Sequence, residues 1–232
     1  MPPSQRLILW DVDGTLLSTD GLAAEAMREA MRRVVGPAIP MERTAYAGKT
    51  DWQIIRESFP TLPPDTIADR LQAFAAAYLG LLQARRDALA ARSRVFPGVV
   101  AALQALAPVG YQAPLTGNIA AVARLKLECV GLTAYLDLAA GAYGDDHFHR
   151  PDLVPIAAAR AAARYGQSFQ RDQIVIVGDT PHDIVCGKLN GARTVAVATG
   201  PYPLEELLAH QPDAALPDLT DVAAVVAAVA GT

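Results

Sequence analysis

The sequence predicts an α/β fold in which a doubly wound parallel sheet carries a helical subdomain inserted after its first strand. Short, largely apolar runs alternate with helical patterns over most of the 232 residues, which is typical of strands covered on both faces. Between residues 18 and 94 no convincing strand pattern occurs, and apolar residues recur at helical spacing. We therefore expect a core of residues 1–17 and 95–232 and a helical cap of residues 18–94.

The elements of the expected core follow a βαβ order. The strand candidates are Leu7–Trp10, Gln112–Leu115, Leu136–Ala140, Ile174–Val177 and Thr194–Ala198. The helix candidates between and after them are Val99–Ala107, Ile119–Val130, Leu153–Tyr165, Ile184–Asn190 and Val222–Ala230.

The expected cap contains two helical regions. Leu22–Val35 is rich in Ala, Met and Arg and has apolar residues at helical spacing. Residues 65–92 predict one long helix or two, with Asp65 as the N-cap. The loops between these regions are marked by Pro37, Pro40, Pro60, Pro63 and Pro64.

Composition excludes several classes of protein. Hydrophobic residues make up 52% and charged residues 19%, which excludes a disordered chain, and the net charge of −4 gives no sign of a nucleic-acid binder. Cys129 and Cys186 stand far apart, so we expect no disulfide framework and a reducing, cytoplasmic location. The apolar runs Leu7–Trp10 and Val222–Ala230 are too short for a signal peptide or a membrane span.

Polar residues follow three of the predicted strands. They form the clusters Asp11–Thr15, Thr116–Asn118 and Gly178–Asp183. Because ligands of an open α/β sheet bind outside the carboxyl ends of its strands, we expect these clusters to converge at one edge. Carboxylates gathered there need a cation, and a donor set of oxygens alone favours Mg²⁺ over Zn²⁺.

The same clusters carry a family resemblance. The segment Asp11–Leu16 resembles the first motif of the haloacid dehalogenase superfamily, Leu115–Asn118 its second and Gly178–Asp183 its fourth, of the form GDxxxD. The place of the third motif is His149–Pro155, where Arg150 stands in the position that usually holds Lys. Motif order, spacing and the helical insert are most similar to the phosphoglycolate phosphatase-like branch, whose cap follows the first motif.

The resemblance implies a role for each carboxylate of the site. Asp11 is the expected nucleophile, which forms an aspartyl-phosphate. Asp13 is the expected general acid and base, and its backbone carbonyl is an expected metal ligand. Asp179, together with Asp11, completes the expected Mg²⁺ site. Asp183 is expected to bind a metal-bound water or to pair with Arg150.

The resemblance also implies which residues bind phosphate. Thr116 is expected to donate its hydroxyl to the phosphoryl group, with help from the backbone around Gly117 and Asn118 at a helix N-terminus. Arg150 is expected to bind phosphoryl oxygens and to offset the charge of Asp11. Arginine in place of lysine is chemically sound here, because it stays charged and binds phosphate bidentately.

The lysines and the cap loop offer further candidates. Lys49 and Thr50 are candidates to contact the leaving group of the substrate, and the alternative is a helix start capped by Thr50 or Asp51. Lys126 and Lys188 fall within predicted helices, where we expect a solvated face.

These inferences predict a Mg²⁺-dependent phosphatase that hydrolyses a small phosphorylated metabolite, without a nucleic-acid or membrane partner. Asp13 argues against a dehalogenase, and Gly178 before Asp179 argues against a hexose-type phosphomutase. Lys49 keeps a phosphonatase open, since that chemistry needs a cap lysine. A non-catalytic phospho-acceptor or regulatory module on the same fold is the alternative from outside enzymology.

Overall fold

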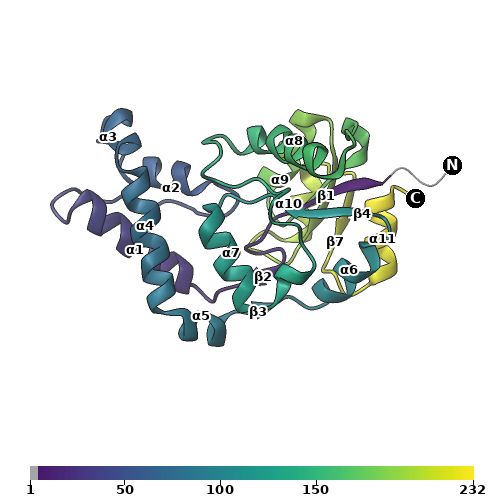
Figure 1. The fold of residues 1–232 in the computed structure, drawn as a ribbon, viewed down its shortest axis with the longest axis horizontal. Helices are drawn as coiled ribbons and strands as arrows, with labels where there is room; N and C mark the ends of the chain where they lie inside the picture. Colours follow the sequence, from purple (N-terminus) through teal and green to yellow (C-terminus); the bar gives the residue numbers. More distant parts are fainter. Residues whose placement is uncertain (1–4) are drawn as a thin grey trace.

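A computed structural model describes residues 5–232, and residues 1–4 of the expected core lie outside the described residues. Its centre is a five-stranded sheet in which every adjacent pair is parallel, which confirms the predicted fold class (Figure 1). In spatial order the strands are β4 (Gly110–Pro114), β1 (Arg6–Trp10), β5 (Ile174–Gly178), β6 (Arg193–Val197) and β7 (Ala214–Leu216).

Helices cover both faces of this sheet, which explains why its strands are apolar at nearly every position. In β1, Leu7 and Leu9 belong to a buried cluster shared with α8 (Leu153–Tyr165), whereas Ile8 and Trp10 belong to one shared with α6 (Val99–Leu106) and α11 (Val222–Ala230). The core helices are α6 (Val99–Leu106), α7 (Ala120–Cys129), α8 (Leu153–Tyr165), α9 (Pro181–Asn190), α10 (Leu204–Ala209) and α11 (Val222–Ala230). Within residues 5–232, no helix has the length and apolar character needed to cross a bilayer.

Two details of the sheet differ from the sequence prediction. The segment Leu136–Ala140 is not a strand, because Asp137 nucleates a turn in which its carboxylate accepts a hydrogen bond from the Ala139 N–H. Only an isolated bridge between Leu115 and Ala142 follows. The short strand β7 was not predicted.

A helical insert lies between two short strands that pair with each other. Strand β2 (Leu17–Ser18) pairs antiparallel with β3 (Arg94–Val95). The helices between them are α1 (Leu22–Val35), α2 (Asp51–Ser58), α3 (Pro64–Ala68), α4 (Leu71–Ala84) and α5 (Arg86–Arg92). The prediction of one or two helices over residues 65–92 is wrong, because the chain forms three. Asp65 is not the N-cap, since Pro64 already occupies the first helical turn.

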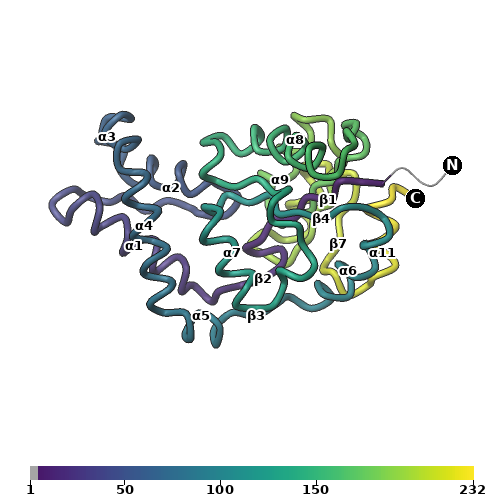
Figure 2. Tube along the Cα trace, viewed as in Figure 1, coloured from purple at the N-terminus to yellow at the C-terminus, as the bar shows by residue number. Residues whose placement is uncertain are grey.

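The insert packs against helix α7 of the core. Helices α1 and α4 share an apolar cluster to which Val122 and Leu125 of α7 and its N-cap residue Ile119 contribute. Figure 2 shows the insert at the end of the molecule that lies farthest from the C-terminus, with α7 between the insert and the sheet. Helix α7 therefore joins the two parts of the chain that meet at the site described next.

Candidate active site

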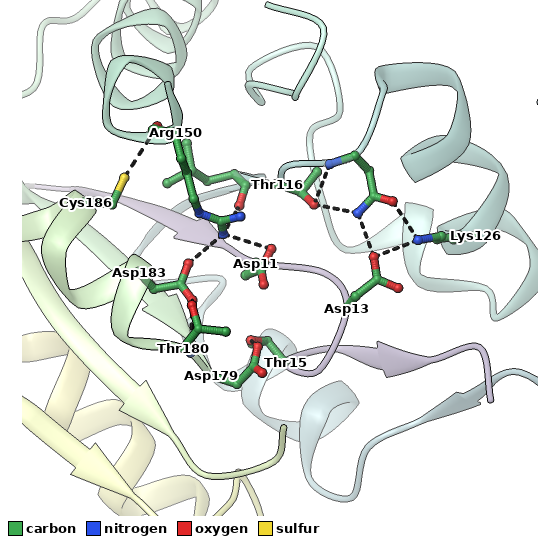
Figure 3. A network of polar contacts seen from close by, with 12 residues as sticks. Asp11, Asp13, Thr15, Thr116, Lys126, Arg150, Asp179, Thr180, Asp183 and Cys186 are labelled. Atoms are coloured by element: carbon green, nitrogen blue, oxygen red, sulfur yellow. Dashed lines mark hydrogen bonds and ion pairs between the residues drawn. The ribbon is translucent and has the colours of Figure 1, made fainter. Parts of the chain in front are cut away.

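The parallel register brings three loops to one edge of the sheet. Trp10 at the end of β1 pairs with Pro114 of β4 and with Val177 of β5. The residues that follow these strand ends are therefore neighbours, and they include Asp11, Thr116 and Asp179 (Figure 3). All three are buried, with at most 4% of their surface exposed.

Three carboxylates form the centre of this edge. Asp11, Asp179 and Asp183 each offer a carboxylate oxygen within 4.8 Å of the others. Two glycines make room for the Asp179 carboxylate, because a Cβ at Gly14 or Gly200 would overlap it. The Thr15 hydroxyl donates a hydrogen bond of 2.8 Å to Asp179 Oδ1 and fixes its orientation.

The negative charges of these buried carboxylates require a positive charge nearby. Burial raises the pKa of Asp11 to about 6, although Arg150 acts to lower it. Burial, followed by the neighbouring charges of Asp11 and Asp183, raises the pKa of Asp179 well above its ordinary range. A hard divalent cation among these oxygens would offset both effects, so the donor set fits Mg²⁺. Asp11, Asp179 and Asp183 are the side chains that could hold it.

Arg150 lies where the third motif was expected, at the start of a 3₁₀ turn that leads into α8. Its Nη2 lies 3.0 Å from Asp11 Oδ1 and 2.6 Å from Asp183 Oδ1, so the expected pairing with Asp183 is present. The other oxygen of Asp183 accepts hydrogen bonds from the Thr180 N–H and hydroxyl, which cap α9. The buried Arg150 Nε has no hydrogen-bond partner among the described residues, and the residue also lines the cavity described below.

Asp13 points away from the acidic cluster. Its Oδ2 accepts hydrogen bonds from Asn118 Nδ2 at 2.6 Å and from Lys126 Nζ at 2.7 Å (Figure 3). Lys126 Nζ also donates to Asn118 Oδ1 at 2.6 Å, which closes a triangle of three side chains. The side chain of Asp13 remains 39% exposed toward the cavity. This arrangement fixes one carboxylate oxygen and leaves the other available.

Lys126 is the main residue that the sequence analysis missed. We expected a solvated helix face, but its side chain is only 3% exposed. The available signal was its spacing on α7, three and four residues after the buried Ala123 and Val122. Asn118 was expected to help bind phosphate through its backbone, and its side-chain amide bonds Asp13, Thr116 and Lys126, which the sequence did not predict.

The hydroxyl of Thr116 is set up to act as a donor. Its Oγ1 accepts hydrogen bonds from the Asn118 N–H at 3.3 Å and from Asn118 Nδ2 at 2.8 Å. A hydroxyl has two acceptor lone pairs and one hydrogen, so the hydrogen is left to donate. The preceding strand aims this group at the cavity that Asp11 and Asp13 also line.

The two cap residues predicted to contact the substrate, Lys49 and Thr50, differ in their surroundings. Thr50 is fully buried and is the N-cap of α2, accepting from the Gln53 N–H and donating to the Phe148 carbonyl. It does not line the cavity, so the structural alternative describes it better than a substrate contact. Lys49 does line the cavity, where it forms an ion pair with Glu57.

Asp51 is a second residue whose role was missed. It reaches from the start of α2 to α7, where its Oδ2 accepts a hydrogen bond of 2.9 Å from the Ile119 N–H. Its own N–H donates to the Gly117 carbonyl at 2.8 Å. Burial raises the pKa of Asp51 to about 7, although Lys126 acts to lower it. Hydrogen bonds thus connect the insert directly to the segment Gly117–Ile119, which precedes α7.

Together the loops and the insert enclose a cavity of about 590 Å³. Carboxylates, a buried arginine and a threonine hydroxyl converge at its inner end on an α/β sheet with a helical insert. Such a convergence of polar side chains at the carboxyl ends of parallel strands is the arrangement of a hydrolase active site. The chain belongs to the haloacid dehalogenase-like hydrolase family, whose model matches residues 8–197.

Individual proteins agree with this assignment. Probable phosphatase IndB from Dickeya dadantii is 29% identical over 219 residues, which cover 93% of this chain and 91% of that protein. A phosphoglycolate phosphatase from Agrobacterium fabrum is 27% identical, with 93% and 90% covered. The crystal structure of a hydrolase from Pseudomonas syringae matches with a TM-score of 0.67 at 19% identity, covering 95% of this chain and 96% of that one. The family resemblance inferred from the motifs is confirmed.

Proposed function

We propose that the protein is a Mg²⁺-dependent phosphatase that hydrolyses a small phosphomonoester through an aspartyl-phosphate on Asp11. The observation that supports this most directly is the position of Asp11, which is buried, adjoins two further carboxylates and lies 3.0 Å from Arg150 Nη2. Both relatives described above carry the name of a phosphatase.

Asp11, Asp179 and the backbone carbonyl of Asp13 would hold the Mg²⁺, with Asp183 beside them. The bound ion supplies positive charge that lets a carboxylate approach an anionic phosphate. Arg150 supplies a second positive charge beside Asp11. Both charges offset the repulsion that a phosphoryl group meets at this edge.

The first half of the reaction transfers the phosphoryl group to the enzyme. A carboxylate oxygen of Asp11 bonds to phosphorus while the bond to the ester oxygen breaks. Thr116 donates its free hydrogen to a phosphoryl oxygen, and Arg150 binds the others. The free oxygen of Asp13 gives its proton to the departing alkoxide, so the product leaves as an alcohol.

The second half regenerates the enzyme. Asp13, now a carboxylate, takes a proton from a water molecule as that water attacks phosphorus. The bond between phosphorus and Asp11 breaks, which releases inorganic phosphate and restores the carboxylate. Asn118 and Lys126 hold Asp13 in one orientation through both halves. We further propose that residues 18–94 act as a cap that excludes bulk water, with Lys49 on its inner wall.

The two aspartates of the first motif provide the test. With p-nitrophenyl phosphate and Mg²⁺, the wild-type enzyme should turn over, and a chelator should abolish the activity. Asp11→Asn should be inactive and unlabelled. Asp13→Asn should slow hydrolysis of the intermediate by about 10²–10⁴-fold and accumulate phosphate on Asp11, seen as added mass on its peptide. Full turnover in folded Asp11→Asn, or activity that survives the chelator, would overturn the proposal.

A further inference from the structure

The part of the cavity wall that comes from the insert differs in chemistry from the part that comes from the sheet edge. The insert contributes Ala23, Ala24, Met27, Ile54 and Tyr78 to the wall of the same cavity that Asp11 and Asp13 line. These side chains surround the space that a leaving group would fill. The cavity volume of about 590 Å³ lies within the range of pockets that bury a ligand much larger than a phosphoryl group.

Every cation on the cavity wall already has a carboxylate partner. Among the described residues, those cations are Lys49, Lys126 and Arg150. Lys49 pairs with Glu57, which is further fixed by hydrogen bonds from Thr44 and Gln53. Lys126 pairs with Asp13, and Arg150 pairs with Asp11 and Asp183. Arg150 lies beside the nucleophile, so it serves the phosphoryl group rather than a leaving group.

The N-terminus of α7, which follows the loop Thr116–Asn118, is also satisfied. The first free N–H groups of α7 donate to carboxylates, Ile119 to Asp51 and Ala120 to Asp145. These N–H groups would otherwise attract an anion. Instead, Asp51 places a carboxylate on the cavity wall. A second negative charge on the substrate would thus meet apolar surface, the hydroxyl residues Thr19 and Tyr46, acidic groups and cations that are already paired.

From these observations we infer that the preferred substrate is a phosphomonoester with an uncharged, largely apolar leaving group. This inference rests on the proposed function. It separates the chain from its phosphoglycolate phosphatase relative, whose named substrate carries a carboxylate. The apolar wall stabilises the leaving group by removing its surface from water. Among the described residues of the wall, no unpaired cation is present to bind a carboxylate on the substrate.

Three esters of primary alcohols test the inference, because their leaving oxygens are alike. They are ethyl phosphate, 2-phenylethyl phosphate and phosphoglycolate, assayed with Mg²⁺ beside p-nitrophenyl phosphate. We expect kcat/KM for 2-phenylethyl phosphate to exceed that for ethyl phosphate by about 10–100-fold. We expect phosphoglycolate to fall below ethyl phosphate by about fivefold or more.

Two variants probe the cause. Ala24→Leu fills the apolar wall and should lower the ratio of 2-phenylethyl to ethyl phosphate about tenfold. Ala90→Leu makes the same change at an exposed site on α5 and should leave that ratio unchanged. Glu57→Gln releases Lys49 from its ion pair and should raise kcat/KM for phosphoglycolate relative to ethyl phosphate by about two- to fivefold.

The outcomes separate the two proposals. If phosphoglycolate is hydrolysed as well as or better than 2-phenylethyl phosphate, the substrate inference is overturned while the phosphatase function stands. If 2-phenylethyl phosphate gains nothing over ethyl phosphate, the apolar wall does not bind the leaving group. If none of the four esters is hydrolysed by folded enzyme with Mg²⁺, the proposed function itself fails.

Discussion

Replacing Lys126 by Met tests how the general acid is held in place. The substitution keeps a long, flexible side chain but removes the charge and the donors that reach Asp13 and Asn118. Asp13 Oδ2 keeps its hydrogen bond from Asn118 Nδ2. Asn118 Oδ1, in a residue only 8% exposed, loses the partner that orients the amide. The Asp13 carboxylate therefore keeps one of its two hydrogen bonds.

The cost in stability follows from these contacts. A buried acceptor left without a partner costs about 1–3 kcal/mol. The lost ion pair adds at most about 1 kcal/mol, because the side chain of Asp13 is 39% exposed and water screens it. Removing a buried ammonium offsets part of this cost. We expect a net loss of about 1–3 kcal/mol, which at roughly 2–4 °C per kcal/mol is a measurable fall in Tm.

The loss of activity in Lys126→Met should differ between formation of the aspartyl-phosphate and its hydrolysis. A fully positioned acid–base group contributes about 10²–10⁴-fold, and a loosened one loses part of that, so we expect kcat to fall about 10–100-fold. With p-nitrophenyl phosphate the leaving group needs little protonation, so formation of the aspartyl-phosphate should slow by no more than about threefold. Stopped-flow assays should therefore show a burst of nitrophenolate in Lys126→Met.

Lys188→Met is the matched control, because Lys188 is an exposed lysine on α9 that donates to the His210 carbonyl. It should show no burst and an unchanged kcat. A Lys126→Met enzyme that keeps full kcat would refute the positioning role. Equal slowing of the burst and of the steady state would also refute it, because that result places Lys126 at the phosphoryl group.

Three further changes test other contacts of the site. The pKa of Asp51 is raised to about 7, so the folded state binds this proton more tightly than the unfolded state does. The contribution of Asp51 to stability is therefore full below its usual pKa and is lost as pH rises through about 7. The unfolding free energy of Asp51→Asn should therefore exceed that of the wild type by a few kcal/mol at pH 8 and differ little from it at pH 4. Equal urea midpoints for variant and wild type at pH 8 would contradict this. Arg150→Ala leaves Asp11 and Asp183 buried without their partner and should cost about 3–5 kcal/mol of unfolding free energy, whereas Arg150→Lys should cost less, an order that denaturant titration checks. Gly200→Ala places a Cβ on the Asp179 carboxylate and should raise the Mg²⁺ concentration needed for half-maximal activity about tenfold or more, while an unchanged Mg²⁺ titration would exclude Asp179 as a ligand.

The part of the site that could be predicted from sequence is the part fixed by strand ends. Asp11, Thr116 and Asp179 each follow a parallel strand directly, so the topology alone brings them together. Arg150 was placed by its motif, and its chemistry as a phosphate-binding cation did not depend on helix geometry. These positions require only the order of the elements and the rule that parallel strands share an edge.

The residues that were missed depend on packing between distant segments. Lys126 meets Asp13 across 113 residues of sequence, and Asp51 meets Ile119 across 68. A lysine in the middle of a helix is exposed in most proteins, so its burial follows only from knowing what covers α7. The prediction for Asn118 concerned its backbone, whereas the contacts of its side-chain amide with Lys126 and Asp13 depend on the same long-range packing.

Helix α7 explains how the insert and the chemistry are joined. Its N-terminus is bonded to Asp51 of the insert, and its second turn carries Lys126, which holds Asp13. The apolar cluster of the insert is completed by Val122 and Leu125 of the same helix. A shift of the insert relative to the sheet would therefore move the groups that orient the general acid, whereas Asp11 and Asp179 stay fixed to the strands. The proposed nucleophile, Asp11, and the proposed general acid, Asp13, are thus supported by different parts of the fold, and only the contacts of Asp13 depend on how the insert packs.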